Sequence, residues 1–197
     1  MKPSKTRAYY FIGPPASGKG THGKLLGGLP GYLHFSMGQA FRALRPGTEE
    51  ERREMEAVHE LTSKGYLADD GITLRVFDDY LQGLMATRAF RPSEQILILD
   101  GMPRRRSQAQ WLADRMEVLR VIEFVCDRHT ILDRVRHRAV QEGRADDSVE
   151  VVETRLKVYD EELGPLMDFF PPGMVARVDS SGSALSVLKS ILAELDS

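Results

Sequence analysis

The chain has 197 residues, of which 42% are hydrophobic and 28% are charged, and 27 Lys and Arg residues against 29 Asp and Glu residues give a formal net charge of −2. This balance argues against a dedicated nucleic-acid binder, which would present a clearly basic face, and the composition excludes a disordered or membrane chain. The single cysteine, Cys126, excludes an internal disulfide and a multi-thiolate zinc site, so we expect a reducing, cytoplasmic setting.

The N-terminal segment has a basic start but does not match a signal peptide. Its apolar run, 8–12, is too short for the hydrophobic region of such a peptide and ends at Gly13 and Pro14. No later apolar run in the sequence is long enough to cross a bilayer. We therefore expect a mature cytoplasmic chain with one main core, no membrane partner and no nucleic-acid partner.

Short apolar runs alternate with helical patterns along the whole chain, which is typical of repeated strand–helix units around a parallel sheet. The runs that predict buried strands lie at 8–12, 32–35, 95–99, 119–125 and 175–178. Apolar residues then recur every three or four positions, as on the buried side of a helix, over 74–84, 149–170 and 185–195. The predicted fold class is α/β, and Pro165 is expected to bend or interrupt the second of these helices.

A glycine-rich motif follows the first predicted strand directly and opens a helix. Its sequence, Gly13-Pro-Pro-Ala-Ser-Gly-Lys-Gly-Thr21, matches the G-x-x-x-x-G-K pattern of a phosphate-binding loop in the required context. Glycines let backbone N–H groups turn toward phosphates, the helix N-terminus adds positive potential, and Lys19 can reach the β and γ phosphates. We expect Ala16 to keep a negative φ, because an L residue is strained at positive values.

A second motif, Asp100 to Arg104, follows the third predicted strand. It would lie at the carboxyl end of a parallel strand, where open α/β sheets bind their ligands. Asp100 can hold Mg²⁺ through water, and Arg104 can bind a phosphate with two hydrogen bonds. Ser107 and Gln110 have the spacing of a capping box and predict the start of the next helix.

The third cluster is rich in arginine. Arg134 and Arg138 are four residues apart, and Arg144 and Arg155 are about three helical turns apart, so each pair can share a face. Surface ion pairs are the ordinary interpretation of such a cluster. A phosphate loop nevertheless implies a polyanionic ligand, and guanidinium groups stabilise the charge on a transferring phosphoryl group.

The histidines show no metal-ligand spacing, and we expect them at the surface or at helix ends: His22, His34, His59, His129 and His137. Trp111 lies on a helical pattern and is expected in the core.

These motifs together resemble the adenylate kinase family of nucleoside monophosphate kinases. The segments that carry the resemblance stand in the family's order: Gly13 to Thr21, His34 to Arg42, Gly65 to Asp70, Asp100 to Arg104 with Gln108, and Gly143 to Asp147. The resemblance implies a P-loop NTPase-type, three-layer fold with a five-stranded parallel sheet, a helical monophosphate-binding segment and a short lid. The implied core is 1–35, 66–138 and 147–197, with the monophosphate-binding segment at about 36–65 and the lid at about 139–146.

The resemblance also implies that ATP binds at the glycine-rich loop. Lys19 would neutralise the transferring phosphates, and Mg²⁺ would lie between the ATP phosphates, Thr21 and a water molecule bound by Asp100. Arg134 would stack on the ATP adenine. The candidate ATP-binding residues are Gly13, Pro15, Ala16, Ser17, Gly18, Lys19, Gly20, Thr21, Arg134, Arg138 and Gly182.

AMP would bind on the other side of the transferred phosphoryl group, where Gln108 would read its adenine through the side-chain amide. The candidate AMP-binding residues are Ser36, Met37, Arg42, Leu67, Gly101, Arg104, Gln108, Arg144 and Arg155. The candidate catalytic residues are Lys19, Arg104, Arg138, Arg144 and Arg155. Asp146 and Asp147 would orient these arginines as the lid closes.

The lid and the monophosphate-binding segment each carry information. Only 139–143 separate Arg138 from Arg144, so the chain resembles the short-lid members, and no zinc is expected.

Met37 and Gln39 stand where the family usually has Thr and Asp. Met37 cannot supply a hydroxyl group near the AMP base, and we predict weaker AMP binding or looser monophosphate selectivity.

The leading prediction is an adenylate kinase, a monomer that transfers a phosphoryl group reversibly from MgATP to AMP and gives two ADP. A kinase for CMP or UMP, or one of broad specificity, is the first alternative; Gln108 favours adenine, because pyrimidine-specific relatives commonly carry Asn there. The second alternative is a non-catalytic ATP-binding sensor, although binding alone would not need the whole arginine set.

Overall fold

The computed structural model describes residues 5–142 and 148–196, with the backbone alone at 138–142. Five strands form one sheet in the order β2-β3-β1-β4-β5, and every pair of neighbours is parallel. The strands are β1 (Thr6–Ile12), β2 (Tyr32–Ser36), β3 (Ile96–Asp100), β4 (Met116–Val125) and β5 (Val175–Asp179). The five predicted strands and the parallel sheet are confirmed; β4 begins earlier than expected, because Met116 already pairs with Thr6.

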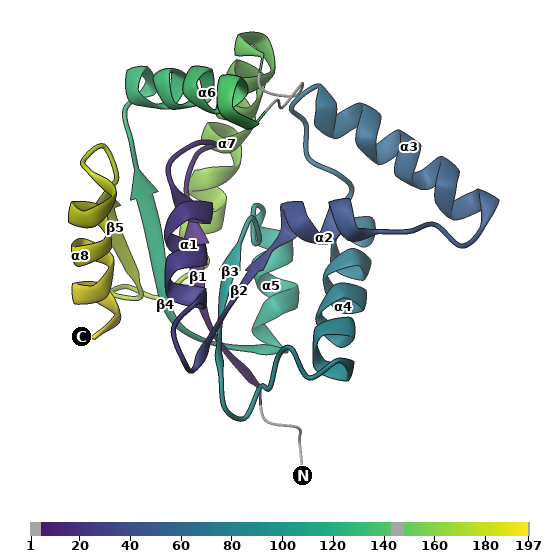
Figure 1. Ribbon diagram of the computed structural model, residues 1–197, viewed down its shortest axis with the longest axis horizontal. Helices are drawn as coiled ribbons and strands as arrows, with labels where there is room; N and C mark the ends of the chain where they lie inside the picture. Colours follow the sequence, from purple (N-terminus) through teal and green to yellow (C-terminus); the bar gives the residue numbers. More distant parts are fainter. Residues whose placement is uncertain (1–4, 143–147, 197) are drawn as a thin grey trace.

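Helices cover both faces of the sheet (Figure 1). One face packs against α1 (Lys19–Gly27) and α8 (Ala184–Leu195), through a cluster that includes Tyr9 and Phe11. The other face packs against α4 (Asp70–Ala86), α5 (Arg106–Ala113) and α7 (Val149–Met167), through a cluster that includes Tyr10 and Ile12. Successive side chains of β1 therefore enter opposite clusters, as the pleat of a strand requires. Both faces of the sheet are buried, as in other parallel sheets covered by helices.

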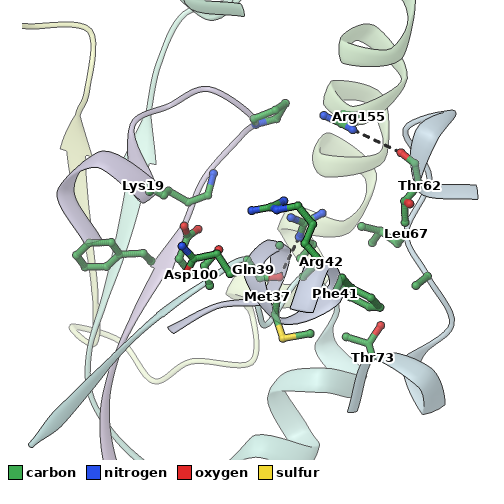
Figure 2. A pocket seen from close by; sticks show the side chains of 18 of the residues that line it. Lys19, Met37, Gln39, Phe41, Arg42, Thr62, Leu67, Thr73, Asp100 and Arg155 are labelled. Atoms are coloured by element: carbon green, nitrogen blue, oxygen red, sulfur yellow. Dashed lines mark hydrogen bonds between the residues drawn. The ribbon is translucent and has the colours of Figure 1, made fainter. Parts of the chain in front are cut away.

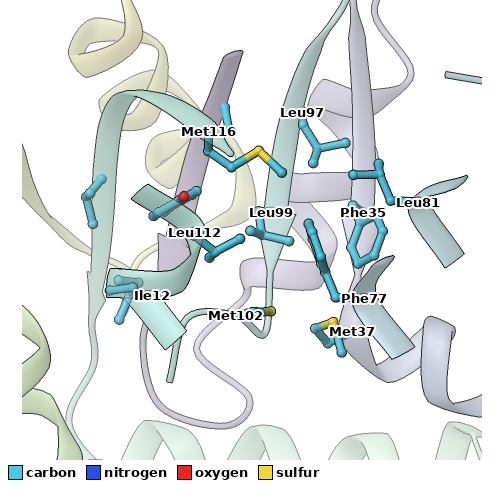
Figure 3. Packing of buried hydrophobic residues seen from close by; sticks show 14 of the residues in the cluster. Ile12, Phe35, Met37, Phe77, Leu81, Leu97, Leu99, Met102, Leu112 and Met116 are labelled. Carbon is cyan, nitrogen blue, oxygen red and sulfur yellow. The ribbon is translucent and has the colours of Figure 1, made fainter. Parts of the chain in front are cut away.

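The larger cluster also explains several helical stripes in the sequence. Phe77 of α4 lies against Phe35 of β2, with ring centroids 4.9 Å apart, and Leu112 of α5 is fully buried in the same cluster (Figure 3). Trp111 meets the Phe77 ring edge to face at 5.9 Å and packs against this cluster, but it is only partly buried, at the margin of the core in which it was expected. Pro165 lies inside α7, which ends two residues later at Met167.

Three further helices lie toward the carboxyl ends of the strands: α2 (Met37–Ala43), α3 (Glu49–Ser63) and α6 (Arg128–Glu142). α3 begins with a capping box in which Thr48 and Glu51 satisfy each other's backbone N–H groups. Among its residues only Val58 is buried, and the helix stands away from the sheet (Figure 1). The highly charged stretch after Arg45 is thus a largely solvated helix.

The predicted capping box of Ser107 and Gln110 is wrong. α5 begins at Arg106, and its N-cap, Arg105, makes no side-chain cap. The Ser107 hydroxyl donates instead to the carboxylate of Asp70, at the start of α4. Tertiary contact with a neighbouring helix has replaced the local cap.

Within residues 5–142 and 148–196, every helix is too short or too polar to serve as a membrane span.

Candidate active site

The carboxyl ends of the strands open into one continuous cleft of about 1820 Å³. β1 lies between β3 and β4, so the chain leaves β1 toward one edge of the sheet and later crosses to the other edge. Such a reversal of strand order creates a crevice for ligands in open α/β sheets. A pocket for one drug-sized ligand is about 300–1,000 Å³, so this cleft is large enough for two nucleotides.

The glycine-rich loop joins β1 to α1 and forms one wall of the cleft. A Cβ atom at Gly13 would lie 2.8 Å from Phe124 Cβ, so the close approach of the loop to β4 requires glycine. Gly18 caps α1 with φ 97°, a left-handed conformation that also favours glycine. Lys19 Nζ donates hydrogen bonds to the carbonyl oxygens of Gly13 (2.8 Å) and Pro14 (2.7 Å). The loop therefore holds the lysine against its own backbone.

The expected negative φ of Ala16 is wrong. Its φ is 57°, in the left-handed region. The path from β1 into α1 needs this conformation at Ala16 as well as at Gly18, although an L residue there is strained by about 1–2 kcal/mol. Backbone strain of this kind concentrates at ligand-binding segments.

Asp100 ends β3 and is only 9% exposed. Its Oδ2 atom lies 3.5 Å from His34 Nε2. Burial raises the pKa of Asp100, but the nearby His34 and the charges of Lys19 and Arg104 outweigh it, so the pKa lies below its usual value. The carboxylate is therefore charged at neutral pH beside Lys19 (Figure 2).

The donor set around Asp100 fits a magnesium ion. A Cβ atom at Gly20 would lie 3.5 Å from Asp100 Oδ2, so this carboxylate borders the first turn of α1, where Thr21 is exposed to the cleft. The described residues contain no group of three or more His, Cys, Asp or Glu side chains able to hold a metal. Mg²⁺ commonly takes only one or two protein ligands and fills its shell with phosphate oxygens and water. Thr21 and Asp100 suffice for that arrangement.

The expectation of surface histidines is wrong for His22 and His34. His22 is 4% exposed, and its ring nitrogens lie 2.9 Å from Gly18 O and 3.1 Å from Ala184 O, between the starts of α1 and α8. The His34 side chain is 8% exposed. A Cβ atom at Gly23 would lie 2.5 Å from the His34 ring, so a glycine of α1 makes the space for it. The spacing of the histidines in the sequence does not reveal that these two rings are buried. The other three histidines are exposed, as expected.

Three predicted phosphate-binding arginines reach the cleft from different elements. Arg42 comes from α2 and is exposed, and Arg104 follows β3 and donates from Nε to Gly101 O at 3.0 Å. Arg155 comes from α7 and donates to Thr62 O, at the end of α3, at 3.4 Å (Figure 2). The structure therefore brings together cationic groups that are far apart in the sequence.

The predicted ATP-base residues also line the cleft. Arg134 of α6 donates to Ser180 O at 2.6 Å, which joins this helix to the loop after β5, and Gly182 lies in that loop. The cleft is also lined by predicted residues of the loop and of the AMP side: Pro15, Ala16, Gly18, Ser36, Leu67 and Gly101. Ser17 of the same loop is fully buried.

The predicted lid residues are only partly within the described chain. The backbone of Arg138 belongs to α6, whereas Arg144, Asp146 and Asp147 lie outside the described residues.

Met37 is 2% exposed and belongs to the larger core cluster. Its side chain lies beside Phe77 and Met102 (Figure 3). Met37 also borders the cleft, so the residue contributes both to the core and to the wall of the predicted AMP site.

The sequence interpretation missed an ion-pair network beside Gln108. Arg105 donates to Asp70 Oδ1 and to Glu162 Oε1, both at 3.1 Å, and its side chain is 29% exposed. Gln108 is 2% exposed and donates to the same Asp70 oxygen at 2.8 Å. The adjacent Asp69 is the N-cap of α4. Such a residue can signal the start of a helix in the sequence, but it does not reveal that this helix contacts α5 and α7.

Comparisons with known proteins agree with this geometry. The family model described as adenylate kinase matches residues 11–173. The chain belongs to the adenylate kinase family. Three adenylate kinases illustrate the likeness: that of Maricaulis maris (strain MCS10) is 36% identical over 193 residues, that of Stenotrophomonas maltophilia (strain R551-3) 33% over 191, and that of Rhodopirellula baltica 31% over 188. The alignments cover 94%, 94% and 92% of this chain and 97%, 97% and 91% of those proteins. The predicted membership of the adenylate kinase family is confirmed.

Proposed function

We propose that the cleft transfers the γ-phosphoryl group of MgATP reversibly to AMP and gives two ADP. The chain is a nucleoside monophosphate kinase by family, and the observation that carries the proposal is the convergence of Lys19, Arg42, Arg104 and Arg155 on one cleft. The predicted phosphotransferase class follows from the family, and the alternatives of a CMP or UMP kinase and of an ATP sensor are not favoured.

ATP would lie along the glycine-rich loop, with its phosphates at the N-terminus of α1 and its adenine between Arg134 and Gly182. Both ends of this path line the cleft. The positive end of the α1 dipole and the backbone N–H groups of the loop favour the phosphates. Lys19 would exchange its bonds to the carbonyl oxygens of Gly13 and Pro14 for bonds to phosphate oxygens.

AMP would bind between α2, α4 and the strand end after β3, with its phosphate on Arg42 and Arg104. Gln108 would read the adenine, and Ser36, Leu67 and Gly101 would line the site. Guanidinium groups fit the phosphate with paired, charge-assisted hydrogen bonds.

The reaction needs no covalent intermediate. An oxygen of the AMP phosphate forms a bond to the γ-phosphorus as the bond from that phosphorus to the β–γ bridging oxygen breaks. Lys19 and the arginines neutralise the charge spread over the transferring group and hold the two nucleotides in line. Thr21 and, through water, Asp100 would hold Mg²⁺, which would supply further positive charge beside the ATP phosphates.

The lid roles remain part of the proposal. Arg138 and Arg144 would close over the phosphates, oriented by Asp146 and Asp147, and exclude water so that AMP accepts the phosphoryl group. The division into core, monophosphate-binding segment (about 36–65) and short lid (about 139–146) belongs to the same proposal. We infer a monomeric cytoplasmic enzyme that uses no zinc and has no nucleic-acid or membrane partner.

A coupled assay of ADP formation with AMP, CMP, UMP and GMP tests this function. We expect the largest kcat/KM with AMP, and turnover that depends on added Mg²⁺. The Lys19→Met variant is the matched negative control, because it removes the cation and keeps the length of the side chain. A larger kcat/KM for CMP or UMP would establish the first alternative, and ATP binding without turnover of any acceptor would establish the sensor.

A further inference from the structure

The side-chain amide of Gln108 is held in one orientation. Its Oε1 atom accepts a hydrogen bond of 2.8 Å from the backbone N–H of Arg104, and its Nε2 atom donates one of 2.8 Å to Asp70 Oδ1. Reversing the amide would set its oxygen against a carboxylate and its NH₂ group against an N–H group. Both bonds would be lost, so the two partners specify the orientation.

The Asp70 carboxylate is itself fixed by groups at the start of α5, one of which is held in turn by α7. Arg105 donates to Oδ1 at 3.1 Å and also to Glu162 of α7 at 3.1 Å, and Ser107 donates to Oδ2. Arg105 additionally donates to Ala68 O at 3.2 Å. The Asp70, Arg105 and Glu162 side chains are only 27%, 29% and 33% exposed. The acceptor for Gln108 is therefore anchored among α4, α5 and α7.

The fixed amide keeps part of its hydrogen-bonding capacity. An amide oxygen can accept two hydrogen bonds and an amide nitrogen can donate two, so Gln108 retains one acceptor site and one donor site. It also lines the cleft. The edge of adenine offers a 6-amino donor beside the N1 acceptor, which complements such a pair. Hypoxanthine, the base of IMP, has a 6-oxo acceptor beside an N1–H donor and needs the reversed amide.

We propose that Asp70 is a specificity-determining positioning residue that makes the monophosphate site select a 6-amino purine over a 6-oxo purine. It does so by accepting from Gln108 Nε2, which together with the Arg104 N–H group excludes the reversed amide. This inference rests on the proposed function, in which Gln108 reads the AMP base.

The Asp70→Ala variant tests the role through the ratio of kcat/KM for AMP to kcat/KM for IMP. The variant removes the acceptor, whereas Arg105 stays tethered to Glu162 and Ala68 and now offers a donor to the amide oxygen. Only the bond from the Arg104 N–H group then opposes the reversed amide, which can gain a bond from Arg105 in exchange. We expect the ratio to fall at least about tenfold, the effect of about one charge-assisted hydrogen bond. The KM for AMP should rise and that for IMP should fall, with the KM for ATP within about twofold of wild type.

Two variants separate this role from general loosening of the helices. Asp70→Asn keeps an acceptor oxygen and should retain a ratio close to that of wild type. Arg105→Ala breaks the same ion-pair network but leaves the bond between Asp70 and Gln108, so it should lower the melting temperature without lowering the ratio. Asp70→Leu, which also lacks an acceptor and has a good helix-forming side chain, takes the place of Asp70→Ala if that variant does not fold.

The outcomes are distinct. An unchanged ratio in Asp70→Ala, or an equal fall in Arg105→Ala, overturns the proposal. Wild-type protein that turns over neither AMP nor IMP refutes the proposed function itself, and the inference with it. Turnover of AMP by every variant, with the ratio lowered only where the acceptor is removed, supports both.

Discussion

Lys19 Nζ donates a 2.7 Å hydrogen bond to the carbonyl oxygen of Pro14, within the loop that precedes its own helix. A second bond, of 2.8 Å, reaches Gly13 O. The loop thus places a positive charge at the N-terminus of α1, where the helix dipole already favours phosphate. The two effects add at one point of the cleft, beside the charged carboxylate of Asp100.

Replacing Lys19 by Met should lower kcat by about 10²–10³-fold, the usual loss when one preorganised donor to transition-state charge is removed. The charge matters most as the phosphoryl group transfers, so kcat should fall more than ATP affinity. Steady-state kinetics of ADP formation measure the first quantity, and calorimetric titration of ATP measures the second. Turnover within about threefold of wild type would contradict the role given to Lys19.

Replacing Arg42 by Ala should raise the KM for AMP by about 10–100-fold, the range expected for a lost hydrogen bond to a charged group. Arg42 is exposed in the cleft on α2, so the fold should be unaffected and the KM for ATP should stay within twofold. Arg52→Ala is the matched control, because Arg52 is an exposed arginine on α3 paired with Glu49 outside the cleft. An equal rise in the KM for AMP in both variants would show that the effect comes from the change in net charge and not from a contact between Arg42 and the AMP phosphate.

The strands and the phosphate loop could be predicted because each depends on local sequence. Buried strands such as β1 and β3 read as continuous apolar runs, since both faces of the sheet are covered. Gly13 and Lys19 lie within one motif whose strand and helix flank it directly. Local pattern was therefore sufficient for the fold class and for the position of the loop.

Contacts between distant segments could not be predicted in this way. Ser107 has the spacing of a helix cap, yet its hydroxyl bonds to Asp70, 37 residues earlier. His34 is buried because Gly23, on another element, leaves room for its ring. In both cases a tertiary partner outweighs the local preference, and a single sequence does not reveal which residues will be neighbours.

Replacing Met37 by Thr should separate its role in packing from its role in selectivity. Met37 is 2% exposed in the core cluster, so a shorter side chain with a hydroxyl group should cost about 2 kcal/mol in the free energy of unfolding. The hydroxyl should also strengthen the preference for AMP over CMP, UMP and GMP. Urea unfolding and the four kcat/KM values measure the two effects. An unchanged preference would remove Met37 from the account of selectivity.

Replacing Ala16 by Gly should leave the protein equally stable or stabilise it by up to about 1.6 kcal/mol. The substitution relieves about 1–2 kcal/mol of strain at φ 57°, offset by the greater flexibility of glycine in the unfolded chain, about 0.4–1 kcal/mol. Arg88→Gly is the matched control, because exposed Arg88 has φ 59° outside the cleft. Urea unfolding should give similar gains for both variants, and a loss of more than about 1 kcal/mol in Ala16→Gly alone would contradict this balance.

Acid should weaken the contribution of Asp70 to stability. Partial burial raises the pKa of this carboxyl group, but hydrogen bonds from Ser107, Gln108 and Arg105 outweigh it, so its folded-state pKa lies below the usual value. The contribution is therefore complete above the unfolded-state pKa of about 3.9 and is lost as the pH falls through the folded-state value. The free energy of unfolding of wild type minus that of Asp70→Asn should stay constant from about pH 7 to 5 and shrink below about pH 4.

Asp78 provides a control of opposite sign for this pH dependence. Burial raises its pKa, the charge of Arg115 lowers it and that of Asp79 raises it, with a net increase. Its charged form therefore destabilises the fold at neutral pH, and protonation removes this penalty as the pH falls through the raised value. Asp78→Asn should be more stable than wild type at pH 7 and lose that advantage in acid. Urea unfolding of the three proteins between pH 7 and 3 measures both trends, and parallel curves would contradict both assignments.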